Sequence, residues 1–253
     1  MKATDAPVEL SLEIRADRDT VFRVMCDPAT FPQWMGPGSE IEPRVGGDVR
    51  VPFANGIVAS GRVVELGNYR LAFSWGYGNE DASSTLVRLS LHACEGGTLL
   101  VLTHEGLESE RDRSGHLAGW RHYTAVLANA CLAERSALIE HAVDRWIEAW
   151  NTSSAAARAE LLEACYAEDG LFRDRGALVE ERQEVAAYID GARRFLPDAR
   201  AERTSDIERC HEYLRYAVRI SDGSGGIMQS GWHFAEIGVE GRLKRVVAFW
   251  EEA

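Results

Sequence analysis

Residues 98–132 read TLLVLTHEGLESERDRSGHLAGWRHYTAVLANACL, and their hydrophobic period changes halfway along. Residues 98–104 form a short, mostly apolar run that is typical of a strand. Further on, apolar residues recur three and four positions apart, which places them on one face of a long helix. The residues on this face are Leu117, Trp120, Thr124, Leu127 and Cys131. The sequence predicts a strand followed by a helix that covers one face of a sheet.

The chain before this stretch begins with a strand and a short helix. Residues 8–14 alternate apolar and polar side chains, as in a half-buried strand. Asp19 is the predicted N-cap of the helix that follows, and Asp27, which precedes a proline, ends it. Residues 31–35 lie between prolines and glycines and are predicted to form a loop.

Turn signals then divide residues 45–104 into an antiparallel meander. Asn55-Gly56 is the clearest of them, because this pair favours a tight hairpin turn. The predicted strands cover residues 45–53, 57–66, 70–75, 84–94 and 98–104. The first half therefore reads as strand, helix, meander and covering helix.

The second half has helices first and strands last. Ile139, Val143, Trp146 and Trp150 have helical spacing. The other predicted elements are helices 155–167 and 184–195 and strands 170–173, 211–220, 227–237 and 242–251. We expect an α+β protein with two domains, residues 1–135 and 136–253.

Length and charge limit the function. The chain has 253 residues and a formal net charge of −12. At about 100–200 residues per domain, this length favours two domains. The acidic balance argues against nucleic acid as a partner, because neutralising phosphates needs clustered basic residues. Without an apolar run of about 18 residues or a secretion signal, we expect no membrane span and a cytoplasmic location.

The sequence gives no sign of a cofactor. The five cysteines are widely spaced and include no Cys-x-x-Cys pair, so neither a zinc site nor a disulfide framework is indicated. Phosphate-binding and dinucleotide-binding glycine motifs are absent, as is the His-Glu-x-x-His zinc motif. We therefore expect no cofactor and no metal.

Several separated motifs link residues 8–132 to a known superfamily. They include DPATFPQWMGP at 27–37, GTLLVLTHEGL at 97–107 and HLAGWRHYTAVLANAC at 116–131. This half resembles the START/SRPBCC helix-grip superfamily, in particular the branch named after the activator of the heat-shock-protein ATPase. The resemblance implies an apolar cavity between the sheet and the last helix. The candidate ligand-binding residues are Trp34, Phe53, Trp75, His104 and Trp120, although large aromatic side chains equally serve as plain core.

Residues 137–252 carry a second set of motifs, namely RWIEAWN, CYAEDGLFRD and GWHFAEIGVEGRLKRVVAFW. They resemble the nuclear-transport-factor-2-like superfamily, in particular the SnoaL-like polyketide cyclases and ketosteroid isomerases. The resemblance implies a cone in which a bent sheet with capping helices surrounds a pocket. The candidate ligand-binding residues here are Trp146, Trp150, Tyr166 and His211.

The isomerase branch suggests a catalytic pair in the second pocket. When the motifs of this branch are aligned with this sequence, the position of its general base corresponds to Asp174. The position of its oxyanion-hole acid corresponds to His233. A carboxylate in an apolar pocket has a raised pKa and can take a proton near neutral pH. Asp174 could equally form a surface ion pair or cap a turn. Strand alternation leaves open whether His233 faces the pocket or lies outside it.

Three functions follow from these resemblances. The leading one is binding of a small, largely apolar organic molecule, polyketide-like, lipid-like or steroid-like, in one or both domains. The second is cofactor-independent acid–base catalysis of the cyclase or isomerase kind. The third is an interaction role, as a chaperone-ATPase regulator or as a module that forms a homodimer through residues 136–253.

Overall fold

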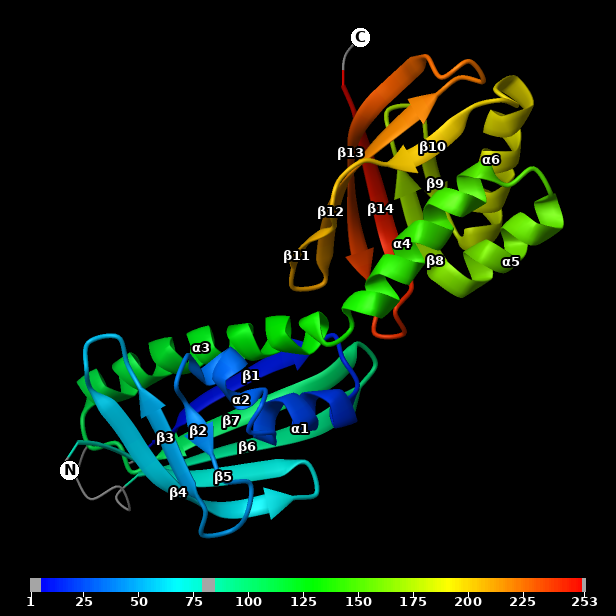
Figure 1. Ribbon diagram of the computed structural model, residues 1–253. Coiled ribbons are helices and arrows are strands. Elements are labelled where there is room, and N and C mark those ends of the chain that lie inside the picture. The colour runs from blue at the N-terminus through cyan, green and yellow to red at the C-terminus, as the bar shows by residue number, and fades with distance from the viewer. Residues whose placement is uncertain (1–5, 79–84, 252–253) are drawn as a thin grey trace. The chain divides into compact units, whose positions relative to one another are not determined.

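The computed structural model describes residues 6–78 and 85–251. Contacts divide the chain into two compact units, which we call the N-terminal unit, residues 1–133, and the C-terminal unit, residues 134–253. Each unit combines helices with one mainly antiparallel sheet (Figure 1). The α+β class predicted from the sequence is therefore confirmed.

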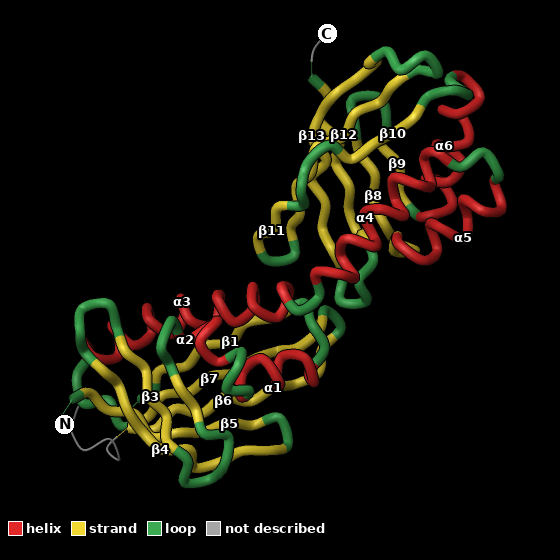
Figure 2. The backbone as a smooth tube through the Cα atoms, in the orientation of Figure 1, coloured by secondary structure: helices red, strands yellow, loops and turns green. Residues whose placement is uncertain are grey.

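The N-terminal unit is a seven-stranded antiparallel sheet with three helices on one face (Figure 2). Its strands are β1 (Val8–Ile14), β2 (Glu40–Ile41), β3 (Asp48–Pro52), β4 (Val58–Gly67), β5 (Arg70–Tyr77), β6 (Thr85–Cys94) and β7 (Gly97–Glu105). Its helices are α1 (Arg18–Cys26), α2 (Phe31–Met35) and α3 (Glu110–Ala133). In the order β1-β7-β6-β5-β4-β3-β2, strands β2 to β7 form a meander, and β1 pairs with β7 at one edge of the sheet. The long helix α3 supplies the predicted cover.

Local turn chemistry explains the hairpins of this sheet. Gly56 has φ +83°, and the Asn55 side chain accepts from the amide of Ile57, which closes the predicted turn between β3 and β4. Asn68 and Tyr69 both have positive φ and join β4 to β5 in two residues. Short loops of this kind keep neighbouring strands in register.

Two local predictions for this unit were wrong. Asp17, rather than Asp19, is the N-cap of α1, because its side chain accepts from the amide of Thr20 at 2.8 Å. Asp19 instead accepts from the Tyr69 hydroxyl at 2.7 Å. Residues 31–35 form the short helix α2 rather than a loop, because Pro32 lies in its first turn, where a missing amide hydrogen costs nothing.

The C-terminal unit is a second sheet with three helices. Its strands are β8 (Tyr166–Arg173), β9 (Leu178–Glu180), β10 (Arg200–Arg203), β11 (Glu208–Cys210), β12 (Tyr213–Ser221), β13 (Ile227–Ile237) and β14 (Leu243–Trp250). Its helices are α4 (Ser136–Asn151), α5 (Ala155–Cys165) and α6 (Arg182–Phe195). The strand order is β10-β12-β13-β14-β8-β9, with β11 paired to β12. All pairs are antiparallel except β14 with β8.

This sheet is larger than the sequence predicted. Strands β9, β10 and β11 were not expected, because three or four residues are too few to show a period. His211 was expected to begin a strand. It lies instead in the turn between β11 and β12 with φ +52°.

Candidate functional site

The inward face of β13 carries His233 into the interior of the C-terminal unit. His233 and Ala235 are buried, whereas Phe234 between them is 43% exposed. The question left open by strand alternation is thereby decided, since the His233 face is the inner one. The imidazole lies 5.4 Å from the ring of Tyr216 and 5.6 Å from that of Trp250, measured between centroids.

A small cavity of about 20 Å³ lies beside His233. Such a volume holds about one water molecule. Trp150, Ile220 and Trp250 are partly exposed, so part of the cavity wall belongs to the surface. The lining residues are Ile147, Trp150, Phe172, Ala201, Val218, Ile220, His233 and Trp250. Except for an imidazole and two indole groups, this wall is purely apolar.

Six buried side-chain polar atoms in this interior have no hydrogen-bond partner. They are Trp146 Nε1, Trp150 Nε1, Tyr166 Oη, Tyr216 Oη, and Nδ1 and Nε2 of His233. Trp146 stacks on Tyr166 at 5.2 Å and meets Trp150 at 5.8 Å, so these rings form one cluster that reaches the cavity wall. Leaving a buried polar group unpaired costs about 1–3 kcal/mol, and native proteins contain few such groups. The unpaired polar atoms of this interior therefore make it the candidate site of the C-terminal unit.

Burial also fixes the protonation states of these groups. It lowers the pKa of His233 to about 3, so the imidazole is neutral at pH 7. It raises the pKa of Tyr166 and of Tyr216, so both phenols keep their protons. The interior is a neutral set of donors with a single imidazole acceptor nitrogen.

Asp174 serves a turn at the end of β8. Its carboxylate accepts from the amide of Gly176 at 2.7 Å, and its backbone pairs with that of Ala177. No hydrogen bond joins Asp174 to His233, because both imidazole nitrogens lack a partner. The structure thus places Asp174 in the turn after β8 and His233 on β13, with no hydrogen bond between them. Their acid–base role stays a prediction.

The other predicted residues of this unit fall into two groups. Trp146, Trp150 and Tyr166 join the aromatic cluster around the cavity. His211 does not line the cavity, because it occupies the β11–β12 turn.

The N-terminal unit has an aromatic cluster of its own beneath α3. The ring of Trp75 lies 5.5 Å from that of Trp120 and 6.5 Å from that of Phe53. The indole Nε1 of Trp120 donates to Nδ1 of His104 at 3.1 Å, which brings strand β7 and helix α3 together. Trp34 lies in α2, with its ring 5.4 Å from Phe31. Four of the five predicted ligand-binding residues here therefore form one contact chain.

His104 is held neutral within this cluster. It is fully buried, and burial, followed by the charge of nearby His116, lowers its pKa to about 3. Since Nδ1 accepts from Trp120, the proton of the neutral ring lies on Nε2, a buried atom without a partner.

An open pocket of about 370 Å³ lies beside this cluster. It is lined by the end of β5, the loop after β7 and the first turns of α3, and includes Tyr77, Asp112 and His116. None of these three residues was predicted from the sequence as a site residue. Asp112, His116 and Trp120 are spaced by four along α3, and this stripe is the signal that could have found the site.

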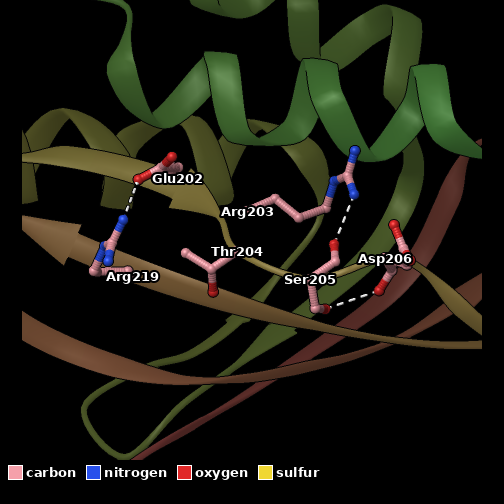
Figure 3. A pocket seen from close by; sticks show the side chains of 6 residues that line it. All are labelled: Glu202, Arg203, Thr204, Ser205, Asp206 and Arg219. Atoms are coloured by element: carbon pink, nitrogen blue, oxygen red, sulfur yellow. Dashed lines mark hydrogen bonds and ion pairs between the residues drawn. The ribbon is translucent and has the colours of Figure 1, made fainter.

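A wider hollow on the C-terminal unit is a weaker candidate. Figure 3 shows its lining of Glu202, Arg203, Thr204, Ser205, Asp206 and Arg219. Arg219 pairs with Glu202 at 2.8 Å, and Arg203 pairs with Asp144 at 3.3 Å. Both guanidinium groups are already matched by a carboxylate, so the hollow has no uncompensated arginine to offer a ligand.

The described residues contain no group of three or more His, Cys, Asp or Glu side chains that could hold a metal ion. Within the same residues, no helix has the length and apolar character required to cross a membrane.

A family model matches most of the N-terminal unit. Residues 15–131 match the family model described as activator of Hsp90 ATPase homolog 1-like protein, which confirms the resemblance predicted for the N-terminal half. No curated protein matches the chain.

Solved structures similar to this chain each cover about half of it. A SnoaL-like family protein from Agrobacterium tumefaciens is 23% identical, with 46% of this chain and 99% of that chain covered and a TM-score of 0.44. The Aha1 dimer from Colwellia psychrerythraea is 18% identical, with 50% and 96% covered and a TM-score of 0.45. CalU16 from Micromonospora echinospora is 26% identical, with 51% and 76% covered and a TM-score of 0.40.

Proposed function

We propose that this chain binds a small, largely apolar organic molecule, and that the binding site is the interior of the C-terminal unit at His233. The observation that carries the proposal is a buried imidazole, 3% exposed, with neither ring nitrogen hydrogen-bonded and an apolar cavity beside it. A ligand that supplies these hydrogen bonds recovers the free energy lost by desolvation.

The shape of the site determines how such a molecule lies. A cavity of about 20 Å³ has room for a head group and not for a whole ligand. The polar head therefore reaches His233, while the apolar body covers the partly exposed Trp150, Ile220 and Trp250. Burying the aromatic rings of this rim against the ligand provides most of the affinity.

The chemistry of the head group follows from protonation. A neutral imidazole offers one donor and one acceptor, and both fit a hydroxyl or an enol. A charged head is disfavoured, because no opposite charge lines the cavity and burial of an unpaired charge is costly. Polyketide-like and steroid-like molecules carry heads of the neutral kind.

Native mass spectrometry of the full chain, purified from its own host, tests whether a ligand is retained. Titration with 2-naphthol, an apolar body with one hydroxyl, tests the site itself. We expect His233→Leu to weaken 2-naphthol binding about 5–10-fold through loss of the hydrogen bond. His141→Leu is the matched control, since it makes the same change at an exposed residue of α4 that does not line the cavity. Equal affinity in His233→Leu and the native chain would contradict the proposal.

Acid–base catalysis is the enzymatic alternative, with Asp174 and His233 as its residues. Since the two side chains are not hydrogen-bonded to each other, a bound substrate would have to bridge them. Once a substrate is found, Asp174→Asn should lower kcat by at least about 100-fold if Asp174 is the general base. Unchanged turnover would leave binding as the function.

The family match of residues 15–131 favours a second candidate function, regulation of a chaperone ATPase by the N-terminal unit. Addition of the full chain to an Hsp90-type ATPase should then raise the rate at which the ATPase hydrolyses ATP, in a saturable manner.

The proposal also includes a cytoplasmic location and a homodimer. The dimer would form through the outer sheet face of the C-terminal unit, where Phe234 and Phe249 are exposed.

A further inference from the structure

The open pocket of the N-terminal unit offers a second site of different chemistry. Its volume of about 370 Å³ lies in the range of small-ligand pockets, about 300–1,000 Å³. Trp75 and Tyr77 line it from β5, whereas Asp112 and His116 line it from α3. The end of a strand and the start of a helix thus hold aromatic rings and polar groups around one space.

Apart from the buried indole Nε1 of Trp75, which has no hydrogen-bond partner, the neutral polar side chains around this pocket are hydrogen-bonded to the protein. His116 Nδ1 donates to the carbonyl of Asp112 at 2.8 Å, because a carbonyl can only accept. The other ring nitrogen, Nε2, is hydrogen-bonded to the Tyr77 hydroxyl at 3.1 Å. The Thr85 hydroxyl donates to the carbonyl of Trp75. These three hydrogen bonds direct the neutral donors toward the protein instead of the pocket.

The charged groups that line the pocket are acceptors. Glu108 and Asp112 are exposed carboxylates at its rim. The Ser109 hydroxyl donates to Asp112, which still has lone pairs for a further donor. The nearby Arg113 is turned to Glu110 and to the Leu107 carbonyl, both at 3.1 Å, and does not line the pocket.

The aromatic side chains of Trp75 and Tyr77 add a second feature that favours a cationic ligand. Trp75 is buried to 3% exposure, its Nε1 is enclosed by protein, and Tyr77 packs with its centroid 6.0 Å from that of Trp75. Aromatic faces attract an ammonium group, and two carboxylates at the rim provide the opposite charge. We infer that this pocket binds a protonated amine carried on a small aromatic or apolar body. The inference is independent of the proposed neutral ligand of the C-terminal unit.

Isothermal titration of the full chain with three matched probes tests this inference. The probes are 2-phenylethylammonium, 2-phenylethanol and 3-phenylpropionate, which share a phenyl ring and differ in charge. We expect the ammonium probe to bind at least about 10-fold more tightly than the alcohol, and added salt to weaken it. The carboxylate probe should bind more weakly than the alcohol, since the rim repels it.

Two double variants with the same change in net charge locate the binding. Glu108→Gln/Asp112→Asn should weaken the ammonium probe at least about 10-fold, whereas Glu9→Gln/Glu40→Gln, exposed acids away from the pocket, should leave it within about two-fold. His233→Leu should leave it unchanged, which separates this site from the C-terminal one. The inference is overturned if no saturation occurs at millimolar ammonium probe, if the alcohol binds as tightly, or if both double variants lose affinity equally. If the first double variant fails to fold, Tyr77→Phe, which keeps the ring, serves as the second test and should retain the preference for the ammonium probe.

Discussion

At the scale of single residues, the C-terminal unit keeps an imidazole where a hydrophobic residue would fit. His233 is surrounded by aromatic and aliphatic side chains, and neither nitrogen is used. Such a residue lowers stability while its nitrogens stay unpaired, and under the proposed function a ligand that supplies the hydrogen bonds offsets that loss. Stability and binding should therefore change in opposite directions at this position.

Replacing His233 by leucine tests that opposition. We expect the free energy of unfolding of the C-terminal unit to rise by about 1–3 kcal/mol, because an unpaired buried polar group is removed and a side chain of similar size remains. Urea unfolding of the ligand-free full chain measures the change. Tyr216→Phe should also stabilise, since its hydroxyl is equally unpaired. A clear loss of stability in His233→Leu would mean that the ring has a partner in solution.

The sequence could predict residue types at the site better than their contacts. Trp75, Trp120 and His104 were predicted as candidate ligand-binding residues through the family resemblance, and in the structure their rings lie in one cluster. His116 was not predicted as a site residue. Its ring nonetheless lies 4.7 Å from that of His104, since a helix packed on a sheet creates contacts that no linear spacing reveals.

At the scale of elements, the outer face of the C-terminal sheet carries an apolar patch. Phe249 of β14 is 59% exposed, and its ring lies 5.5 Å from Phe234 of β13. Next to them, the guanidinium of Arg215 covers the ring of Trp232 at 4.9 Å. Exposed aromatic groups on a flat sheet face are typical of association surfaces.

A charge in this patch tests the homodimer. Phe249→Glu should turn a dimer into a monomer, because association would bury two unpaired carboxylates in an apolar interface. Sedimentation equilibrium of the full chain measures the state. Phe195→Glu is the matched control, since Phe195 is 87% exposed at the end of α6 rather than on the sheet. A native chain that is monomeric at all accessible concentrations would rule out the dimer.

Long periodic elements were predictable and short ones were not. The expected strand 227–237 and the helix α3 emerged from alternation and from three-four spacing. Strands β9, β10 and β11 exist because their neighbours offer an edge to pair with, which is tertiary information. Helix α2 was not predicted because it contains a proline, a residue that usually indicates a loop or a helix end.

At the scale of the whole molecule, each unit buries one neutral histidine, His104 in the first and His233 in the second. Both have a folded pKa of about 3, far below the value of about 6.5 in an unfolded chain. Between these pH values the histidine binds a proton in the unfolded state but stays unprotonated in the native state. Stability therefore falls as the pH drops from 6.5 toward 3.

The pH dependence of stability can be measured for each buried histidine. Lowering the pH from 7 to 5 should cost each unit about 2 kcal/mol from its histidine alone. In His233→Leu, the C-terminal unit should lose about 2 kcal/mol less over the same interval than in the native chain. Urea unfolding at the two pH values, at constant salt, measures the difference. Equal losses in the two chains would show that His233 titrates normally in the folded state.

The placement of β14 has a consequence for synthesis. It is the last described strand, yet it lies inside its sheet, between β13 and β8, and it is the sheet's link to the β8–β9 hairpin. During synthesis, the edge of β8 keeps its backbone N–H and C=O groups unpaired until residues 243–250 leave the ribosome. We expect nascent chains stalled before residue 243 to recruit holdase chaperones through the second half, and chains that include residues 243–250 to release them.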